Sequence, residues 1–220
     1  MRQRSSDNWN FRAGTWDALK TELIDFEGDY PVIGSPSSPD FQGVCTANDY
    51  KAYSDSGLVS MFVDDYILER FWNNPEKYIP KMKGCAAVMS PDFSLFIGMP
   101  EPMLRWNVYR NRLVGYVWEK AGAVVVPTIS WADESSFRYC FEGVRKGSVV
   151  AVSNTGCKTA EHRAFFDRGY QAMISALAPS KILFQCSGRF RAEYQAENVT
   201  FIDSFFQKKR KSWAEEAGKV

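Results

Sequence analysis

Short apolar runs alternate with longer segments of helical periodicity from residue 58 onward. The apolar runs are rich in β-branched residues, which favours strands, and they span residues 58–63, 86–90, 123–129, 148–152, 181–186 and 199–202. The helical segments span residues 66–83, 102–121, 134–144 and 159–177. This alternation predicts an α/β fold, with a mainly parallel sheet of about six strands covered by helices. A doubly wound sheet and an incomplete β/α barrel both fit the pattern.

The same pattern divides the chain into three parts. Residues 1–45 are predicted to form an N-terminal arm and loop region, residues 46–205 the α/β domain, and residues 206–220 a basic C-terminal tail. The tail holds one basic cluster at residues 208–211. This cluster is a candidate nucleic-acid contact, although short charge runs near termini are usually solvated.

Composition narrows the classes of protein to consider. The chain has 27 basic and 26 acidic residues, so its formal charge of +1 creates no overall field that would attract nucleic acid or anionic lipid. Five scattered cysteines without a C-x-x-C pair, and a single histidine, argue against a structural zinc site or a disulfide framework. No apolar stretch reaches the length of a membrane span. We therefore predict a soluble cytoplasmic protein with no membrane partner.

The segment SNTGCKT, residues 153–159, lies between an apolar run and a helix, where phosphate-binding loops occur. A loop of the form GxxxxGK[ST] aligned on Lys158 would need glycine at positions 152 and 157, where this chain has Val152 and Cys157. The nucleoside-triphosphatase hypothesis is therefore rejected. The turn can still offer backbone N–H groups to an anion.

Polar residues follow every predicted strand. Because ligands of α/β folds gather at the carboxyl ends of the strands, these residues are candidate site groups. They comprise Asp64, Asp65, Ser90, Asp92, Ser94, Thr128, Ser130, Trp131, Ser153, Asn154, Thr155, Gly156, Ser187, Gly188 and Asp203. Each also suits the simpler role of capping the next helix. Adjacent strand residues face opposite sides, so the pattern does not choose between Asp64 and Asp65.

The helix at 102–121 carries polar residues on its apolar face. That face is formed by Met103, Trp106, Leu113, Val114, Val117 and Trp118. Asn107 and Arg110 fall in the same arc, whereas Arg105, Arg112 and Glu119 are predicted to point toward solvent or an outer layer.

An arginine aimed at a core requires an anionic partner. We predict that Asp92 or Asp65 is the partner of Arg110. A structural ion pair and a ligand-binding role are both consistent with such a contact, and the nearby Asn107 favours a site.

Cys157 and His162 lie near the start of the last helix, and His162 shares a helix face with Phe166, Met173 and Leu177. A thiolate at a helix N-terminus beside a histidine would be an activated nucleophile. Five residues of separation across a turn do not ensure contact, however, so this is the weaker catalytic hypothesis.

Four segments resemble the domain-of-unknown-function family 4417, found in bacteria, phages and mobile elements: SPDFS (90–94), NVYRNRLVGYVWEKAG (107–122), VVPTISW (125–131) and FEGVRKGSVVAVSNTG (141–156). The likeness runs from about residue 58 to 190. The matching positions are Asp92, Ser94, Asn107, Arg110, Arg112, Trp131, Ser153 and Gly156. The resemblance implies a phage, prophage or plasmid setting, where proteins of this size often act on nucleotides or nucleic acid, and it supplies no established activity.

Our leading hypothesis is a carboxylate- or Mg²⁺-dependent hydrolase or transferase that acts on a nucleotide or nucleic acid. Its predicted catalytic residues are Asp92, Asp65 and Arg110, with Asp65 and Asp92 as the candidate Mg²⁺ ligands. The predicted substrate-binding residues are Ser94, Asn107, Trp131, Ser153, Asn154 and Gly156, with Trp131 stacking on a base or sugar. Two carboxylates also permit glycosidic chemistry, including removal or exchange of a base.

The alternative is a non-catalytic interaction protein, such as a phage-encoded regulator or inhibitor of a host protein. In that case the arm at residues 1–14 and the tail at residues 205–220 would bind the partner, and the polar cluster would be structural. The sequence does not predict an oligomeric state.

Overall fold

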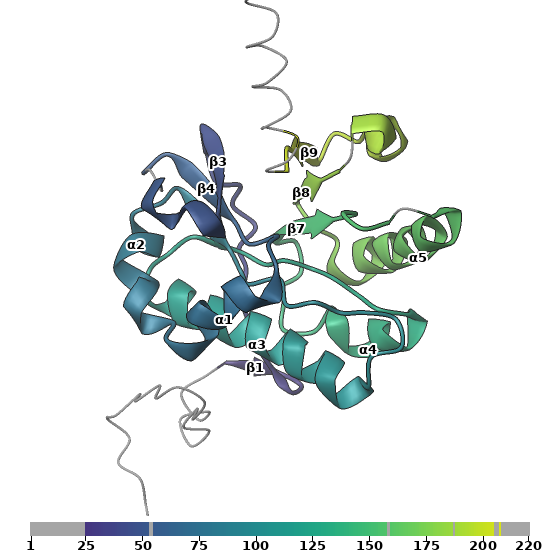
Figure 1. Cartoon of the computed structure of the whole chain (residues 1–220), viewed down its shortest axis with the longest axis horizontal. Helices are drawn as coiled ribbons and strands as arrows, with labels where there is room; N and C mark the ends of the chain where they lie inside the picture. The colour runs from purple at the N-terminus through teal and green to yellow at the C-terminus, as the bar shows by residue number, and fades with distance from the viewer. Residues whose placement is uncertain (1–24, 53–54, 158, 187, 205–206, 208–220) are drawn as a thin grey trace, which may run out of the picture.

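The computed structural model describes residues 25–52, 55–157, 159–186, 188–204 and 207 (Figure 1). A short antiparallel pair is formed by β1 (Phe26–Glu27) and β2 (Tyr30–Pro31). A four-stranded parallel sheet contains β3 (Gly43–Thr46), β4 (Gly57–Ser60), β5 (Ala87–Met89) and β6 (Val125–Val126). A three-stranded parallel sheet contains β7 (Val149–Ser153), β8 (Lys181–Gln185) and β9 (Val199–Ile202).

Within the described residues, the two parallel sheets are joined by an isolated β-bridge. Thr128, just after β6, pairs in parallel with Ala151 of β7. The Ile129 N–H donates to the Ala151 carbonyl, and the Ala151 N–H donates to the Pro127 carbonyl, each at 2.8 Å. One sheet of about six strands is therefore not what the chain forms. Strand order follows chain order in both sheets, without the reversal that a doubly wound sheet requires.

Each predicted apolar run contains a strand, because buried strands of parallel sheets read as continuous β-branched runs. The strand β3 was not predicted, since its four residues GVCT follow a polar loop segment. It is an edge strand that pairs only with β4 among the described strands.

The helices are α1 (Asp65–Asn73), α2 (Ile79–Lys83), α3 (Glu101–Lys120), α4 (Phe137–Cys140) and α5 (Ala160–Leu177). Short 3₁₀ turns are η2 (Ala47–Ala52), η3 (Glu76–Tyr78), η4 (Glu134–Ser136) and η5 (Gly188–Tyr194). The predicted helix at 66–83 is broken before Pro75, because proline disfavours the helical conformation of the residue that precedes it. The predicted helix at 134–144 is shortened to the four residues of α4.

Helix α3 is shared by two hydrophobic clusters. Leu113 and Trp118 in its second half pack with β4, β5, β6, α1 and α2. Leu104 and Val108 in its first half pack with β7, β8, β9, α4 and α5. Figure 1 shows α3 running between α1 and α4. The close approach needs Gly115, where an added Cβ would lie 2.8 Å from Ile33 Cδ1.

This central position overturns part of the predicted helix face. Arg112, predicted to face solvent, is only 2% exposed, while Met103 and Trp106, predicted to face the core, are 53% and 47% exposed. The middle of α3 packs against two hydrophobic clusters. A prediction that assumes one buried face therefore assigns to solvent the residues that pack against the second cluster. Trp106 instead packs edge-on against Trp72 of α1, with ring centroids 5.2 Å apart.

No helix in the described part of the chain is long and apolar enough to cross a membrane. The predicted arm at residues 1–14 and the basic cluster at residues 208–211 lie outside the described residues. The proposed boundaries at residues 45 and 206 stay predictions.

Candidate active site

A cleft of about 770 Å³ lies at the carboxyl ends of all seven parallel strands. Each strand, or the loop that follows it, contributes at least one polar lining residue, in chain order Thr46, Asp64, Asp92, Ser130, Thr155, Gln185 and Ser204. Sites for small molecules usually measure about 300–1,000 Å³. The cleft therefore lies where the strand pattern predicted a site and has the size of a ligand-binding pocket.

Asp92 is the most perturbed acidic residue of the cleft. Its side chain is only partly accessible, and its Oδ1 atom is buried with no hydrogen-bond partner among the described residues. Burial raises the pKa of the carboxyl from 3.8 to about 7. The nearby Ser130 hydroxyl and the charge of Arg112 lower this pKa, while the neighbouring Asp65 raises it. At neutral pH Asp92 is thus partly protonated and suited to move a proton in either direction.

Asp65 fixes the loop that carries Asp92. Its carboxylate accepts hydrogen bonds from the Ser94 N–H at 3.1 Å and from the Ser94 hydroxyl at 2.9 Å. Asp64 precedes α1, is exposed, and lines the cleft, which Asp65 does not. Of the two carboxylates, Asp64 lines the cleft together with Ser94, whereas Asp65 is bound to Ser94.

Arg110 has a different partner from the predicted one. Its Nη1 atom lies 2.5 Å from Glu69 Oε1, and its guanidinium lies over the Phe93 ring at 3.8 Å. The prediction of Asp92 or Asp65 as the main partner is wrong, because α1 packs on α3 with the residue one turn beyond Asp65 facing Arg110.

Asn107 continues this contact toward the loop after β5. Its Oδ1 accepts from Arg110 Nη2 at 2.6 Å, and its Nδ2 donates to the Ser94 carbonyl at 2.8 Å. Asn107 and Arg110 do not line the large cleft. They hold the Ser94 segment against α3, so their contribution to the cleft is positional.

A polar layer centred on Asn111, a residue that the sequence analysis missed, lies behind the segment that carries Asp92. Asn111 Nδ2 donates to Thr128 Oγ1 at 2.5 Å and to the Pro91 carbonyl at 2.7 Å, and the Ser90 hydroxyl donates to Asn111 Oδ1 at 2.8 Å. These contacts tie α3 to the ends of β5 and β6. The available signal was the consecutive run Arg110-Asn111-Arg112 within an otherwise largely apolar half of the helix.

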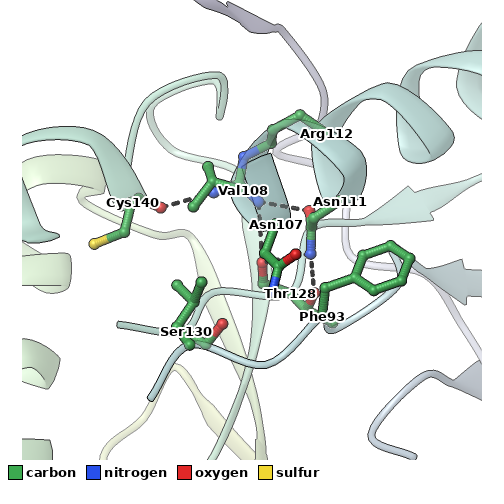
Figure 2. Close-up of a pocket in the computed structure, with 9 residues that line it drawn as sticks. Phe93, Asn107, Val108, Asn111, Arg112, Thr128, Ser130 and Cys140 are labelled. Carbon is green, nitrogen blue, oxygen red and sulfur yellow. Dashed lines mark hydrogen bonds between the residues drawn. The ribbon is translucent and has the colours of Figure 1, made fainter. Parts of the chain in front are cut away.

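Arg112 completes this layer and, among the described residues, forms no ion pair with a carboxylate. Figure 2 shows its hydrogen bonds to the pocket residues. Its guanidinium donates to Asn111 Oδ1 at 2.6 Å and to three backbone carbonyls, those of Thr128 at 3.2 Å, Cys140 at 2.8 Å and Glu142 at 3.0 Å. Burial lowers the pKa of Arg112 to about 10, so the residue stays charged at neutral pH. The structure thus places a buried positive charge close enough to Asp92 to affect its pKa.

Trp131 lines the cleft, as predicted for a ligand-contacting residue. Its ring packs against Phe166, with centroids 5.1 Å apart, and against Phe141 at 6.2 Å. The indole also lies on the backbone of α5 at Gly169, where an added Cβ would be 2.1 Å from Trp131 Nε1. The position of Trp131 at the cleft wall therefore depends on a glycine in the neighbouring helix.

We expect Gly169→Ala to displace the Trp131 indole and to lower the free energy of unfolding by about 1–3 kcal/mol, because the helix backbone leaves no room for a methyl group. The measurement is urea denaturation followed by tryptophan fluorescence. The control is Gly188→Ala, because a Cβ added at Gly188 meets no atom within 4 Å. Gly147 is not used as a control because its φ of 76° strains any other residue. Equal stability of Gly169→Ala and the wild type would contradict the placement of Trp131.

The turn after β7 divides its polar groups between the cleft and the interior. Ser153 and Thr155 line the cleft and are linked by a 2.8 Å hydrogen bond, and Gln185 Nε2 donates to Thr155 at 3.1 Å. Gly156 also lines the cleft and has a φ of 99°. Asn154, predicted to bind substrate, is 7% exposed and donates instead to Cys186 Sγ at 3.3 Å. Its role is to join β7 to the end of β8.

Cys157 and His162 both line the cleft. Burial raises the pKa of the Cys157 thiol, and the negative charge of Asp167 raises it further. An activated cysteine nucleophile needs the opposite change. His162 is exposed, and its backbone N–H donates a hydrogen bond to the side-chain hydroxyl of Thr159, the N-cap of α5, at 3.1 Å. The Cys–His hypothesis is therefore not favoured.

The candidate Mg²⁺ ligands do not form a ready ligand set. Within the part of the chain that the structure describes, no three His, Cys, Asp or Glu residues are grouped so that they could hold a metal ion. Asp65 already accepts hydrogen bonds from Ser94, and a ligating Asp92 would have to lose its proton. The described residues therefore do not fit a Mg²⁺ ion.

Comparison with known proteins supports the resemblance seen in the sequence. Residues 41–205 match the family described as Domain of unknown function (DUF4417). The Gene 1 protein of Mycobacterium phage D29 is 30% identical over 97% of this chain and 83% of its own length. The Gene 1 protein of Mycobacterium phage L5 is 30% identical over 94% of both chains.

A shorter match, 33% identical over 121 residues, is to NAD-dependent protein deacetylase 1 of Corynebacterium efficiens and covers 53% of this chain and 37% of that protein. No solved structure gives a significant match. The family match spans most of the chain and includes every residue that lines the cleft. The chain therefore belongs to the DUF4417 family and is similar to phage Gene 1 proteins.

Proposed function

We propose that this phage-associated protein is an enzyme that acts on a nucleotide or nucleic-acid substrate in the strand-end cleft, with Asp92 as its general acid–base group. The observation that supports this most is the Asp92 carboxyl, whose pKa is raised to about 7 where it lines the cleft. Perturbed carboxyl groups in clefts are typical of acid–base catalysis.

The lining of the cleft suits a base and a sugar. Trp131, Phe96 and Phe165 supply aromatic surfaces, and Ser130, Thr155 and other hydroxyl groups supply hydrogen bonds. The ionisable lining residues of the described chain include Asp64, Asp92 and His162 but no lysine or arginine. This balance favours an uncharged ring and its hydroxyl groups over a polyphosphate.

Two carboxyl groups in the segments that follow the neighbouring strands β4 and β5 support a hydrolase or transferase. Protonated Asp92 can donate to a leaving group, and its ionised form can accept a proton from an attacking hydroxyl or water. Asp64, exposed in the cleft before the first residue of α1, is available to stabilise positive charge, as glycosidic cleavage requires. The name of the Corynebacterium efficiens relative refers to NAD, which associates one relative of this chain with a dinucleotide.

A thermal-shift screen tests this proposal. The ligands are nucleosides, mononucleotides, NAD and short single-stranded DNA, each with the wild type, Asp92→Asn and the matched control Asp40→Asn, whose exposed carboxylate lies outside the cleft. We expect at least one ligand to raise the melting temperature of the wild type and of Asp40→Asn by several degrees, and that of Asp92→Asn by much less. Equal shifts in all three proteins, or none in the wild type, would contradict the proposal.

Exposed apolar side chains favour the interaction protein as a second candidate. Phe96, Ile97, Met103 and Trp106 are 63%, 53%, 53% and 47% exposed, on the loop after β5 and the start of α3. Exposed apolar patches mark protein-binding surfaces. This candidate would be favoured over the enzyme if no ligand raised the melting temperature and a host protein bound the wild type but not Met103→Lys.

A further inference from the structure

Gln185 places a buried amide in the strand-end cleft. It is the last residue of β8, is only 6% exposed, and lines the cleft. Side chains alternate between the two faces of a strand, so Gln185 shares a face with Leu183, which belongs to the same hydrophobic cluster as β4 and β5. Phe184, on the opposite face, packs with α5. The Gln185 side chain therefore stands on the face of β8 that is turned toward the first sheet.

Two hydroxyl groups hold the nitrogen of this amide. Ser153 is the partner of Gln185 in the β7–β8 pair. Gln185 Nε2 donates to Thr155 Oγ1 at 3.1 Å and to Ser153 Oγ at 3.4 Å. The Ser153 hydroxyl in turn donates to Thr155 Oγ1 at 2.8 Å. The amide is thus fixed through its nitrogen, and its oxygen takes no part in this network.

One acceptor and one donor of these cleft-lining residues remain unused. Gln185 Oε1 receives no hydrogen bond from a described residue, and protein atoms do not enclose it completely. Thr155 Oγ1 accepts from both Ser153 and Gln185, which occupies its two lone pairs, so its own hydrogen has no acceptor among the described residues. An amide oxygen on a buried side chain is costly to leave without a donor. The cleft is where a ligand can supply one.

The turn after β7 fixes the position of the Thr155 hydroxyl. The Cys157 N–H donates to the Asn154 carbonyl at 3.1 Å, and the Thr155 N–H donates to Ser153 Oγ at 3.1 Å. Gly156 supplies the positive φ of 99° that closes this turn. The unused donor of Thr155 is therefore held next to the Gln185 amide by both backbone and side-chain contacts.

We propose that Gln185 and Thr155 form a base-binding subsite of the cleft, which recognises the hydrogen-bonding edge of a nucleobase. An N–H or amino group of the base donates to Gln185 Oε1, and the adjacent ring nitrogen or carbonyl accepts from the Thr155 hydroxyl. Proteins that bind unpaired bases recognise them by hydrogen bonds to such edges. The inference rests on the proposed function for its substrate class and adds the residues that select the base.

The chemistry of the subsite favours a base over a phosphate. Phosphate oxygens only accept hydrogen bonds at their ionised positions, so the acceptor Gln185 Oε1 opposes a phosphate at this place. The lining of the cleft, as far as the structure describes the chain, also lacks lysine and arginine. A sugar diol does carry both a donor and an acceptor, which makes ribose a necessary comparison.

The subsite lies apart from the acid–base group. Asp92 follows β5, and β6 lies between β5 and β7 in the order of the strands. Two inter-strand spacings, roughly 10 Å along the sheets, therefore separate Asp92 from the subsite. A ligand that binds with its base at Gln185 extends its sugar toward Asp92, so the reacting bond lies away from the recognised edge.

Isothermal titration calorimetry with adenosine, guanosine, cytidine, uridine and ribose tests the subsite. Gln185→Met keeps the length of the side chain without the amide, and Thr155→Val removes an exposed hydroxyl. The matched controls are Gln42→Met and Thr200→Val, which make the same changes outside the cleft. Thermal melting checks that each variant folds, and Thr155→Val carries the test by itself if the buried Gln185→Met does not fold.

We expect at least one nucleoside to bind the wild type. Gln185→Met and Thr155→Val should each raise the Kd of that nucleoside roughly tenfold, because each removes one hydrogen bond to the base. The two control variants should bind it as the wild type does. Methylation of the base at the ring nitrogen of its Watson–Crick edge should weaken binding to the wild type, with little further loss in Gln185→Met.

Three results overturn the subsite: equal binding of the nucleoside to the wild type, Gln185→Met and Thr155→Val; ribose binding as tight as nucleoside binding; or no nucleoside binding to the wild type. The first two leave the enzyme proposal standing. If the two variants lose binding as expected while Asp92→Asn keeps full turnover, the subsite stands and the acid–base role of Asp92 fails.

Discussion

The Asp92→Asn variant is expected to lose about 10²-fold to 10⁴-fold in turnover while folding at least as well as the wild type. The loss arises because asparagine cannot exchange a proton with the substrate. Product formation is measured by mass spectrometry on the ligand that gives the largest thermal shift. The exposed Asp40→Asn variant, made by the same chemical change, should keep wild-type turnover.

The stability of Asp92→Asn provides a second readout that needs no substrate. The pKa of Asp92 is raised from 3.8 to about 7 in the folded protein, so folding favours the protonated carboxyl. The wild type therefore loses stability as the pH rises from about 4 to about 7, whereas the variant has no such group. In urea denaturation at pH 4, 6 and 8, the stability of the variant relative to the wild type should increase with pH. A relative stability that falls with pH would contradict a buried, raised Asp92.

Arg112→Met is expected to lower the free energy of unfolding by about 3 kcal/mol or more. The substitution removes the buried guanidinium, and with it the Arg112 hydrogen bonds to Asn111 Oδ1 and to the carbonyls of Thr128, Cys140 and Glu142. Asn111 Oδ1 keeps only its bond from the Ser90 hydroxyl. Urea denaturation at pH 7 measures the loss.

The matched control is Arg138→Met, because Arg138 is 59% exposed at its side chain and pairs with the partly exposed Glu101. Exposed pairs contribute about 1 kcal/mol or less, so the control should fall near the wild type. An Arg112→Met protein as stable as Arg138→Met would show that Arg112 is not the buried anchor described above.

The sequence predicted which residues meet at the strand ends better than it predicted the contacts between them. Parallel strands were readable as β-branched runs, and their carboxyl ends place Asp92, Ser94, Trp131 and Ser153 in one cleft. This works because the rule depends only on strand direction and loop position. It requires no knowledge of how helices pack.

The contacts of α3 could not be read in the same way. A helical wheel gives the angle of a side chain about its own axis, not the neighbour that it meets. Arg110 meets Glu69 rather than Asp65 because the register of α1 against α3 sets the pair. Arg112 is buried because a second cluster packs on the side of α3 that the wheel assigned to solvent.

The similarity to the phage Gene 1 proteins raises the question of whether they share the strand-end cleft. These proteins align over almost the whole chain, so the strand-end cleft is a feature to look for in them as well. A carboxyl at the position of Asp92 would be the residue to test there first.

The most direct test of the account is the titration of the Asp92 carboxyl carbon by NMR, in the wild type alone and saturated with the ligand that stabilises it most. We predict a midpoint near 7 in the free protein and a clear displacement when the ligand is bound. A midpoint near 4, or one that no bound ligand moves, would contradict the claim that Asp92 is the acid–base group of this cleft.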